Sequence, residues 1–228
     1  MKILKIIMAV ILLSIVSISV IYLPEAKETT GNTVETYCVV VDAGHGGIDP
    51  GKVAVNGELE KNINLQIANE LKNQLEETGL KVILTRTDDN GLYQESDTNK
   101  KAVDMRNRCE LITQSKADVV VSIHQNSFTD SSVCGAQVFY YTHSDNGKKL
   151  AECIREHILS NTDEDNDRPV KANDSYYMLI NTPCPTVIVE CGFLSNYVEA
   201  EKLSDSNYQR ILAQSISRGI LDFLETND

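Results

Sequence analysis

Short apolar runs alternate with longer segments of helical period along the chain from Cys38 onward. Each apolar run has the length of a strand, and each periodic segment has the length of a helix that buries one face. This alternation is typical of parallel strands joined by helical crossovers, so we predict a single α/β domain with a mostly parallel central sheet flanked by helices. The first predicted strand starts at Cys38 and runs into the glycine-rich turn 44–47; the other strands are 81–86, 118–126, 135–142 and 186–193, and the helices are 60–77, 98–116, 147–159 and the closing region 199–224.

The segment 60–77 shows the helical pattern most clearly. Ile63, Ile67, Leu71 and Leu75 recur every four residues and form one apolar face, and a glycine follows the segment. A repeat of this spacing predicts an amphipathic helix packed against the sheet. The segment 135–142 alternates apolar and polar residues instead, which predicts a strand at or near an edge of the sheet.

An uncharged apolar run of 18 residues, 6–23, precedes the domain. As a helix it would measure roughly 27 Å, about the thickness of the hydrocarbon core of a bilayer. Lys2 and Lys5 precede this run, which predicts that the rest of the chain lies outside the cytoplasm. Residues 24–26 fit the cleavage rule of a secretory signal peptide badly. We therefore expect a signal anchor, in preference to a cleaved signal peptide, over residues 1–24, a linker over residues 25–36 and the folded domain over residues 37–228.

The charge balance and the cysteines limit the possible partners and cofactors. The formal net charge is −12, from 21 basic and 33 acidic residues. A surface this acidic repels phosphate backbones, so we expect no nucleic acid partner. The six cysteines contain no C-x-x-C pair, and their spacing does not match a structural zinc site. Several lie in apolar runs, where buried free thiols are common, so we expect most of them to be unpaired.

Ionisable side chains follow three of the predicted strands. The first strand leads to Asp42 and His45, the third leads to His124, and the last leads to Glu190. Because parallel strands end at the same edge of a sheet, these side chains are expected to meet there. Glu60 begins the first helix and returns to the same edge. Two imidazoles and a carboxylate, with one position left for water, form a common catalytic zinc set, and a further carboxylate beside them would be the general base.

Each of these residues also has an ordinary explanation when it is taken alone. His45 fits a turn residue, His124 fits a core histidine, and Glu190 fits the partner of an arginine. Their joint placement favours a metal site, because ionisable groups at the ends of buried strands destabilise a fold unless something pairs them. The residues by themselves leave both interpretations open.

Five motifs along the chain resemble one known family. The motifs are DAGHGGIDPG (42–51), LEKNINL (59–65), VILTR (82–86), SIHQNS (122–127) and VIVECGFLSN (187–196). In this order and spacing, across Cys38–Leu224, they look like the zinc-dependent N-acetylmuramoyl-L-alanine amidases of the amidase-3 family. The resemblance implies an α/β catalytic domain that hydrolyses the amide bond between N-acetylmuramic acid and L-alanine in the peptidoglycan stem peptide.

The same resemblance implies a role for each of four residues. His45, Glu60 and His124 match the zinc ligands of the family, and Glu190 matches its catalytic glutamate. Zinc would activate a water molecule, and Glu190 would take its proton and return it to the departing amine. Asn126 lies two residues beyond His124, faces the same way if the strand continues, and is a candidate for contact with the substrate.

The layout of the chain also resembles one group within the family. A lone catalytic domain behind an apolar segment, without wall-binding repeats, is similar to the spore-cortex and germination-specific amidases of endospore-forming bacteria. Their product feeds the formation of muramic-δ-lactam, which implies action outside the cytoplasm, in the space between mother cell and forespore. An acidic domain offers no obvious binding surface for anionic wall polymers, so a helper protein that delivers or activates the enzyme is also expected. The polar stretches 88–99 and 160–175 are either solvated loops or the rim of a binding groove.

Three other functions compete with the amidase. A zinc peptidase acting on wall peptides would use the same ligands and would differ only in the bond that it cuts. A cysteine hydrolase would use Cys191 with His124, although a thiol one residue after a buried strand lacks the exposure that reactive thiols need. A membrane-anchored wall-binding protein without catalysis is the third.

Arg86 and Arg106 are expected to pair with the surplus of acidic residues.

Overall fold

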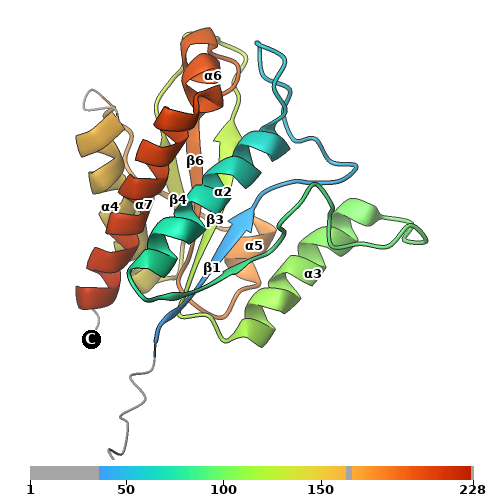
Figure 1. Ribbon diagram of the computed structural model, residues 1–228, viewed down its shortest axis with the longest axis vertical. Helices are drawn as coiled ribbons and strands as arrows, with labels where there is room; N and C mark the ends of the chain where they lie inside the picture. The colour runs from blue at the N-terminus through green and yellow to red at the C-terminus, as the bar shows by residue number, and fades with distance from the viewer. Residues whose placement is uncertain (1–35, 163–165, 227–228) are drawn as a thin grey trace, which may run out of the picture. The chain divides into compact units, whose positions relative to one another are not determined.

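The computed structural model describes residues 36–162 and 166–226 as a layered α/β structure (Figure 1). The predicted signal anchor and most of the predicted linker therefore lie outside the described residues. Within the described ranges no helix is both long and apolar enough to cross a membrane. The elements in chain order are β1 (Cys38–Ala43), α2 (Glu60–Glu77), β2 (Lys81–Leu84), α3 (Lys100–Ser115), β3 (Val119–Asn126), β4 (Gln137–Tyr141), α4 (Asp145–Thr162), β5 (Lys171–Asn173), α5 (Tyr177–Ile180), β6 (Thr186–Phe193), α6 (Tyr197–Ser204) and α7 (Ser206–Thr226).

The strands form one six-stranded sheet in the order β2-β1-β3-β6-β4-β5. β2, β1, β3 and β6 are parallel to one another, while β4 runs antiparallel to β6, and β5 runs parallel to β4. The carboxyl ends of β1, β3 and β6 therefore lie at one edge of the sheet, called the carboxyl edge below. This arrangement confirms the predicted single α/β domain with a mostly parallel sheet, and β4 lies near the sheet edge as its alternating pattern predicts.

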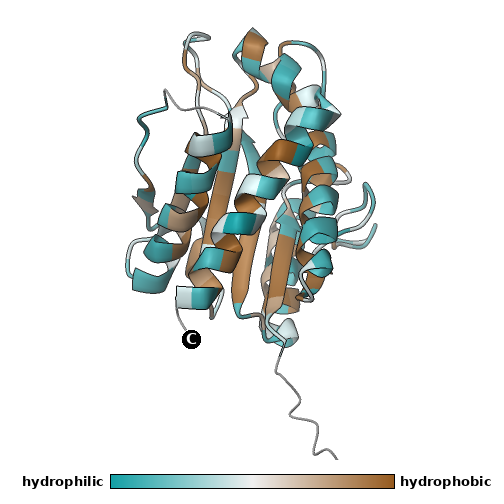
Figure 2. Cartoon of the chain, turned by 60° about the vertical axis from the view of Figure 1, so that its left-hand side comes forward, coloured by the Kyte–Doolittle hydropathy of each residue, from teal (hydrophilic) through white to brown (hydrophobic). Residues whose placement is uncertain are grey.

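Helices cover both faces of the sheet. α2, α4 and α7 pack together on one face, and α3 and α5 contact each other and the sheet on the opposite face. The larger core lies under the first group and includes the predicted helix face of Ile63, Ile67, Leu71 and Leu75. Figure 2 shows the result: the strands are mostly hydrophobic and lie between helices whose outer sides are largely hydrophilic. Because the core is continuous along β1, β3 and β6, it fixes the ends of these three strands relative to one another.

Two elements were not predicted, and one predicted element is divided. β5 and α5 lie at the end of, or just after, the polar stretch 160–175 that was expected to be a loop. β5 consists of Lys171, Ala172 and Asn173, which carry no apolar pattern because the strand pairs only with β4 at the edge of the sheet. The closing helical region is two helices, α6 and α7, separated at Asp205. The cysteines are free thiols, as expected.

Candidate metal centre

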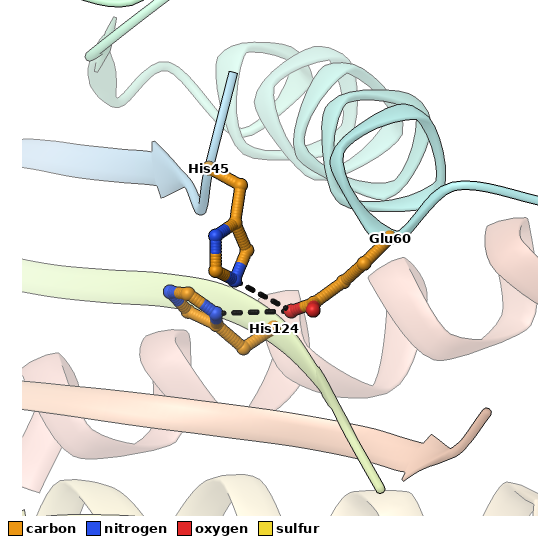
Figure 3. A group of neighbouring side chains, drawn as sticks. All are labelled: His45, Glu60 and His124. Atoms are coloured by element: carbon orange, nitrogen blue, oxygen red, sulfur yellow. Dashed lines mark hydrogen bonds and ion pairs between the residues drawn. The ribbon is translucent and has the colours of Figure 1, made fainter. Parts of the chain in front are cut away.

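Three side chains from separate elements meet at the carboxyl edge (Figure 3). His45 lies in the turn after β1, His124 lies near the end of β3, and Glu60 is the first residue of α2. Glu60 Oε1 lies 3.1 Å from His45 Nε2 and 3.1 Å from His124 Nδ1. The two imidazole rings meet edge to face, with their centroids 4.9 Å apart. One ligand atom from each residue lies within 4.8 Å of the other two, so the three predicted ligands form one cluster.

The spacing of these atoms suits a zinc ion. Zinc in proteins is tetrahedral, with bonds of about 2.0–2.2 Å to nitrogen and oxygen, which places ligand atoms about 3.3 Å apart. Both contacts to Glu60 Oε1 are close to this separation. Two histidines and one carboxylate also leave the fourth position of the ion free, as catalytic zinc sites do. The residues present therefore fit zinc in both chemistry and geometry.

The Glu60 carboxylate is buried and is surrounded by hydrogen-bond donors. Its Oε2 accepts from the backbone N of Lys52 at 2.7 Å, and its Oε1 accepts from the backbone N of Gln125 at 3.1 Å. Burial opposes ionisation, but hydrogen bonds and charges from His124 and His45 outweigh it and lower the pKa of Glu60. The side chain is thus held as an anion in one orientation, which is the state that a metal ligand requires.

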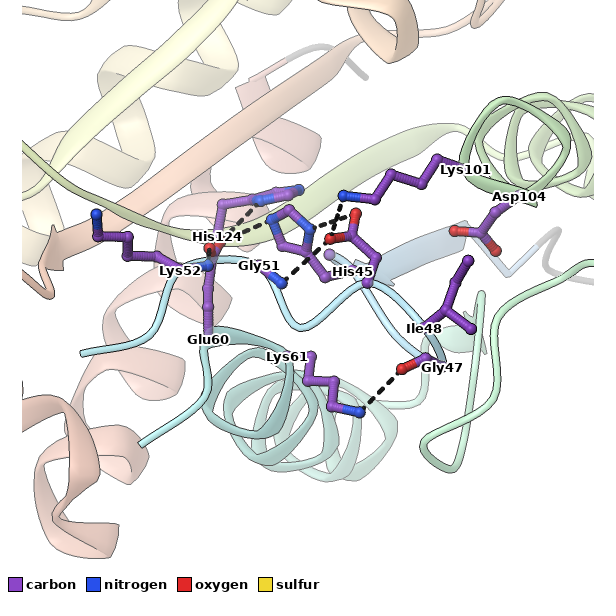
Figure 4. Close-up of polar contacts among 12 residues, drawn as sticks. His45, Gly47, Ile48, Gly51, Lys52, Glu60, Lys61, Lys101, Asp104 and His124 are labelled. Atoms are coloured by element: carbon purple, nitrogen blue, oxygen red, sulfur yellow. Dashed lines mark hydrogen bonds and ion pairs between the residues drawn. The ribbon is translucent and has the colours of Figure 1, made fainter. Parts of the chain in front are cut away.

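His45 is oriented by Asp49, a carboxylate that the sequence analysis did not single out. Figure 4 shows the two residues whose side chains contact this carboxylate, His45 and Lys101. Asp49 Oδ2 lies 3.0 Å from His45 Nδ1, and Asp49 Oδ1 accepts a hydrogen bond from Lys101 Nζ at 2.7 Å. A partner on Nδ1 directs the opposite nitrogen, Nε2, toward Glu60, as outer carboxylates do in zinc sites. Burial works against protonation of His45, but Glu60 and Asp49 together raise its pKa. The spacing of Asp49, four residues after His45 in the same turn, is the signal that would have identified it.

Two glycines make room for the cluster. A Cβ atom on Gly44 would lie 2.3 Å from the ring of His124, and a Cβ atom on Gly51 would lie 2.5 Å from Glu60 Oε2. Gly51 also has φ +67°, a backbone conformation that side chains of L-residues disfavour. The glycines of this turn are therefore required by the close approach of the backbone to the histidine and glutamate side chains.

Glu190 lies beside the cluster but is not one of its members. It is in β6, directly across from His124 of β3 in the strand register. Burial, as the main cause, raises the pKa of Glu190, although the neighbouring histidines act in the opposite direction. Its Oε2 is buried and has no hydrogen-bond partner among the described residues. A buried carboxylate oxygen that no other described side chain or backbone group binds, next to a candidate ligand cluster, has the chemistry that proton transfer needs.

The remaining candidates of the sequence analysis are not members of the cluster. Asn126 ends β3 beyond a register shift with β6, and its Oδ1 accepts from the backbone N of Ser127 at 2.7 Å. Cys191 is 1% exposed, and burial strongly raises the pKa of its thiol, which does not favour the cysteine hydrolase. The prediction for Arg86 is wrong, because its hydrogen bonds go to backbone carbonyls and not to carboxylates.

The comparison with known proteins decides the family. The model of the N-acetylmuramoyl-L-alanine amidase family matches residues 39–222. The chain belongs to this amidase family. It is therefore a hydrolase of the N-acetylmuramoyl-L-alanine amidase class, whose substrate, peptidoglycan, lies outside the cytoplasm. The predicted resemblance is confirmed.

Individual relatives agree with this assignment. The chain is 38% identical over 189 residues to the germination-specific N-acetylmuramoyl-L-alanine amidase of Bacillus subtilis, covering 81% of this chain and 78% of that protein. It is 32% identical to the amidase LytC of Bacillus subtilis, over 84% of this chain and 36% of LytC. Among solved structures, the CwlD amidase from Clostridioides difficile, in complex with the GerS lipoprotein, superposes with a TM-score of 0.82 at 41% identity, covering 84% of this chain and 100% of that chain.

Proposed function

We propose that this amidase is zinc-dependent and cleaves the amide bond between N-acetylmuramic acid and the L-alanine of the stem peptide. His45, Glu60 and His124 hold the zinc ion, and Glu190 is the general base. One observation carries the proposal: the three candidate ligand atoms lie within 4.8 Å of one another, and Glu190, whose Oε2 has no hydrogen-bond partner among the described residues, lies on the strand next to His124.

The metal ion and the carboxylate of Glu190 have separate roles in the reaction. Zinc, when bound, lowers the pKa of water toward neutrality and polarises the amide carbonyl. Glu190 accepts the proton of the attacking water at its free Oε2 and then delivers it to the nitrogen of the departing L-alanine. An amide nitrogen is a poor leaving group until it is protonated, so this delivery is required.

The substrate would lie across the carboxyl edge, between the ligand cluster and the surrounding loops. We assign Asn126 a contact with the substrate, because it follows His124 at the open end of β3. The stretch 88–99 belongs to the rim of this region, since the hydroxyl oxygen of Tyr93 accepts a hydrogen bond from the backbone N of Ile48 at 2.8 Å. The turn that carries His45 is thus packed against a loop that the substrate would meet.

The biological setting of the proposal is the spore cortex, where the product would feed the formation of muramic-δ-lactam. The germination-specific relative from Bacillus subtilis supports this setting. The apolar run 6–23 would anchor the chain to a membrane. The complex of CwlD with a lipoprotein supports a helper protein for this chain as well.

The test is an assay of products. The purified protein, loaded with zinc, is incubated with peptidoglycan in intact form and after removal of stem crosslinks, and the products are identified by mass spectrometry. Release of peptides that begin with a free L-alanine amine is expected, and addition of a chelator should abolish it. Cleavage only within the peptide would establish a zinc peptidase instead. Bound zinc without any product, with and without a helper, would leave a wall-binding protein. Intact muramic-δ-lactam in spores that lack the protein would refute the cortex role.

A further inference from the structure

Arg86 is buried under the metal centre and binds only backbone carbonyls. It is 4% exposed. Its Nε donates to Ala43 O at 2.9 Å, its Nη1 donates to Asp88 O at 2.8 Å, and its Nη2 donates to Gly44 O at 3.1 Å and to Lys61 O at 2.6 Å. No carboxylate of the described chain lies within ion-pair distance of it. Burying a guanidinium group without a carboxylate partner is costly, so these contacts need a reason.

Arg108 approaches the same turn from α3. It is 1% exposed, and its Nη1 donates to Asp42 Oδ1 at 2.8 Å and to Ala43 O at 2.7 Å. Its Nη2 donates to His45 O at 2.6 Å, while its Nε binds Asp104 Oδ2 at 2.8 Å. Unlike Arg86, Arg108 therefore has two carboxylate partners. Its position in α3 ties the turn to the helix layer on that face of the sheet.

The carbonyls that the two arginines bind are those that set the ligand positions. Ala43, Gly44 and His45 are consecutive, and their carbonyl oxygens are all bound by one or both guanidinium groups. Lys61 directly follows Glu60 in the first turn of α2. One guanidinium group, that of Arg86, thus joins the backbone beside His45 to the backbone beside Glu60. His45 itself has φ 62°, a conformation that a non-glycine residue keeps only when its surroundings hold it.

We propose that Arg86 is a positioning residue for the metal centre, assisted by Arg108: it sets the distance between His45 and Glu60 before the metal binds. This inference rests on the proposed zinc function. The planar guanidinium group presents donors in a fixed fork, so it spans the two backbones at once. A lysine keeps the positive charge but has a single nitrogen on a flexible stem, so it cannot reach carbonyls on both sides in the same way.

A positioning role and a purely structural role predict different measurements. If Arg86 only stabilises the fold, its replacement lowers the melting temperature of the metal-free protein and leaves zinc affinity unchanged below that temperature. If it positions the ligands, zinc affinity falls even where the metal-free protein is fully folded. Zinc affinity must therefore be measured well below the melting temperature, in every variant.

The experiment uses full-length protein, as wild type, Arg86→Lys and Arg106→Lys. Arg106 is an exposed arginine of α3, so its variant is the matched control. The dissociation constant for Zn2+ is measured by competition with a chromophoric chelator, and the visible spectrum of the Co2+ form reports ligand geometry. We expect Arg86→Lys to bind zinc roughly 10–100-fold more weakly, the range seen when outer partners of metal ligands are removed, with a changed Co2+ spectrum. Arg106→Lys should match the wild type in both measurements.

The outcomes separate this inference from the proposed function. Equal zinc affinity and equal Co2+ spectra in folded Arg86→Lys and wild type overturn the positioning role while the zinc site stands. Wild type that binds no zinc removes the zinc function itself. If Arg86→Lys shows no cooperative melting, Arg86→Gln is measured in the same way, because a neutral amide avoids the cost of an unpaired buried charge. Failure of both variants to fold overturns the inference in favour of a structural role.

Discussion

Replacing Glu190 with glutamine tests the assignment of the general base most directly. Glutamine has nearly the shape of glutamate but cannot accept a proton. Because Glu190 Oε2 has no hydrogen-bond partner among the described residues, the change breaks no contact at that atom. Because Glu190 is outside the ligand cluster, the change also removes no metal ligand. The loss should therefore fall on proton transfer alone.

The size of this loss follows from the role. General acid–base catalysis contributes roughly 10²–10⁴-fold to a rate, so kcat of Glu190→Gln should fall by that factor, or about 3–5 kcal/mol in barrier height. KM should change little, since the substrate still meets the same side-chain shape. In the metal-free protein, Glu190→Gln should be more stable than the wild type at neutral pH. A carboxyl group whose pKa is raised by burial stabilises the fold below its unfolded pKa and loses this contribution as the pH rises through the folded pKa.

Three assays on one preparation decide the matter: rates on defined muropeptides, zinc content, and urea unfolding of the metal-free form. Zinc content should equal that of the wild type. Loss of zinc from a folded Glu190→Gln variant would show that Glu190 is a ligand, and retained activity would show that another group carries the proton. Either result would refute the assignment.

Three further predictions concern the cluster and the charged core beneath it. His124→Ala should lose both zinc and activity while remaining folded, as judged by metal analysis and circular dichroism; full zinc content would contradict its role as a ligand. Asp49→Ala should weaken zinc binding roughly 10–100-fold, because His45 loses the partner of its Nδ1, and an unchanged affinity in a chelator competition would refute this. Asp42 has a pKa lowered to about 2, because Arg108 and the Ser122 and Thr85 hydroxyls outweigh its burial. Its ionisation should stabilise the fold by about 2 kcal/mol above pH about 4, and this contribution should be lost as the pH falls toward about 2. The free energies of unfolding of metal-free wild type and Asp42→Asn, measured with urea, should therefore converge as the pH falls across that range.

The sequence predicts the sheet, and the side chains that meet at its carboxyl edge, for one shared reason. β1, β3 and β6 are buried on both faces, so each is a nearly continuous apolar run, and parallel pairing then brings their ends together. His124 and Glu190 could be expected to be neighbours on this basis alone. Glu60 follows from the same logic, because the helix after β1 must begin at that edge.

The sequence did not predict the contacts of Asp42 and Arg86, because these depend on which hydrogen-bond partners lie nearby in the folded chain. Asp42 is expected at the same edge as His45, yet it lies within β1 and binds Arg108 of α3, because side chains alternate between the two faces of a strand. Arg86 binds carbonyls whose positions exist only once the turn has formed. No periodicity encodes such contacts. β5 was not predicted for a different reason: an edge strand of three residues buries too little side-chain surface to require an apolar pattern.

The direction of β1 determines how the enzyme can be held. β1 enters the sheet at the edge opposite the candidate metal centre, and its six residues, at about 3.3 Å each, separate its two ends by about 20 Å. α7 begins beyond β6 and runs back, so that it ends on the same side where β1 starts (Figure 1). An attachment at either end of the domain, whether a natural tether or an affinity tag, therefore holds the domain by the side opposite the carboxyl edge. If the protein is immobilised on a bead through either end, its carboxyl edge should remain accessible to insoluble wall fragments.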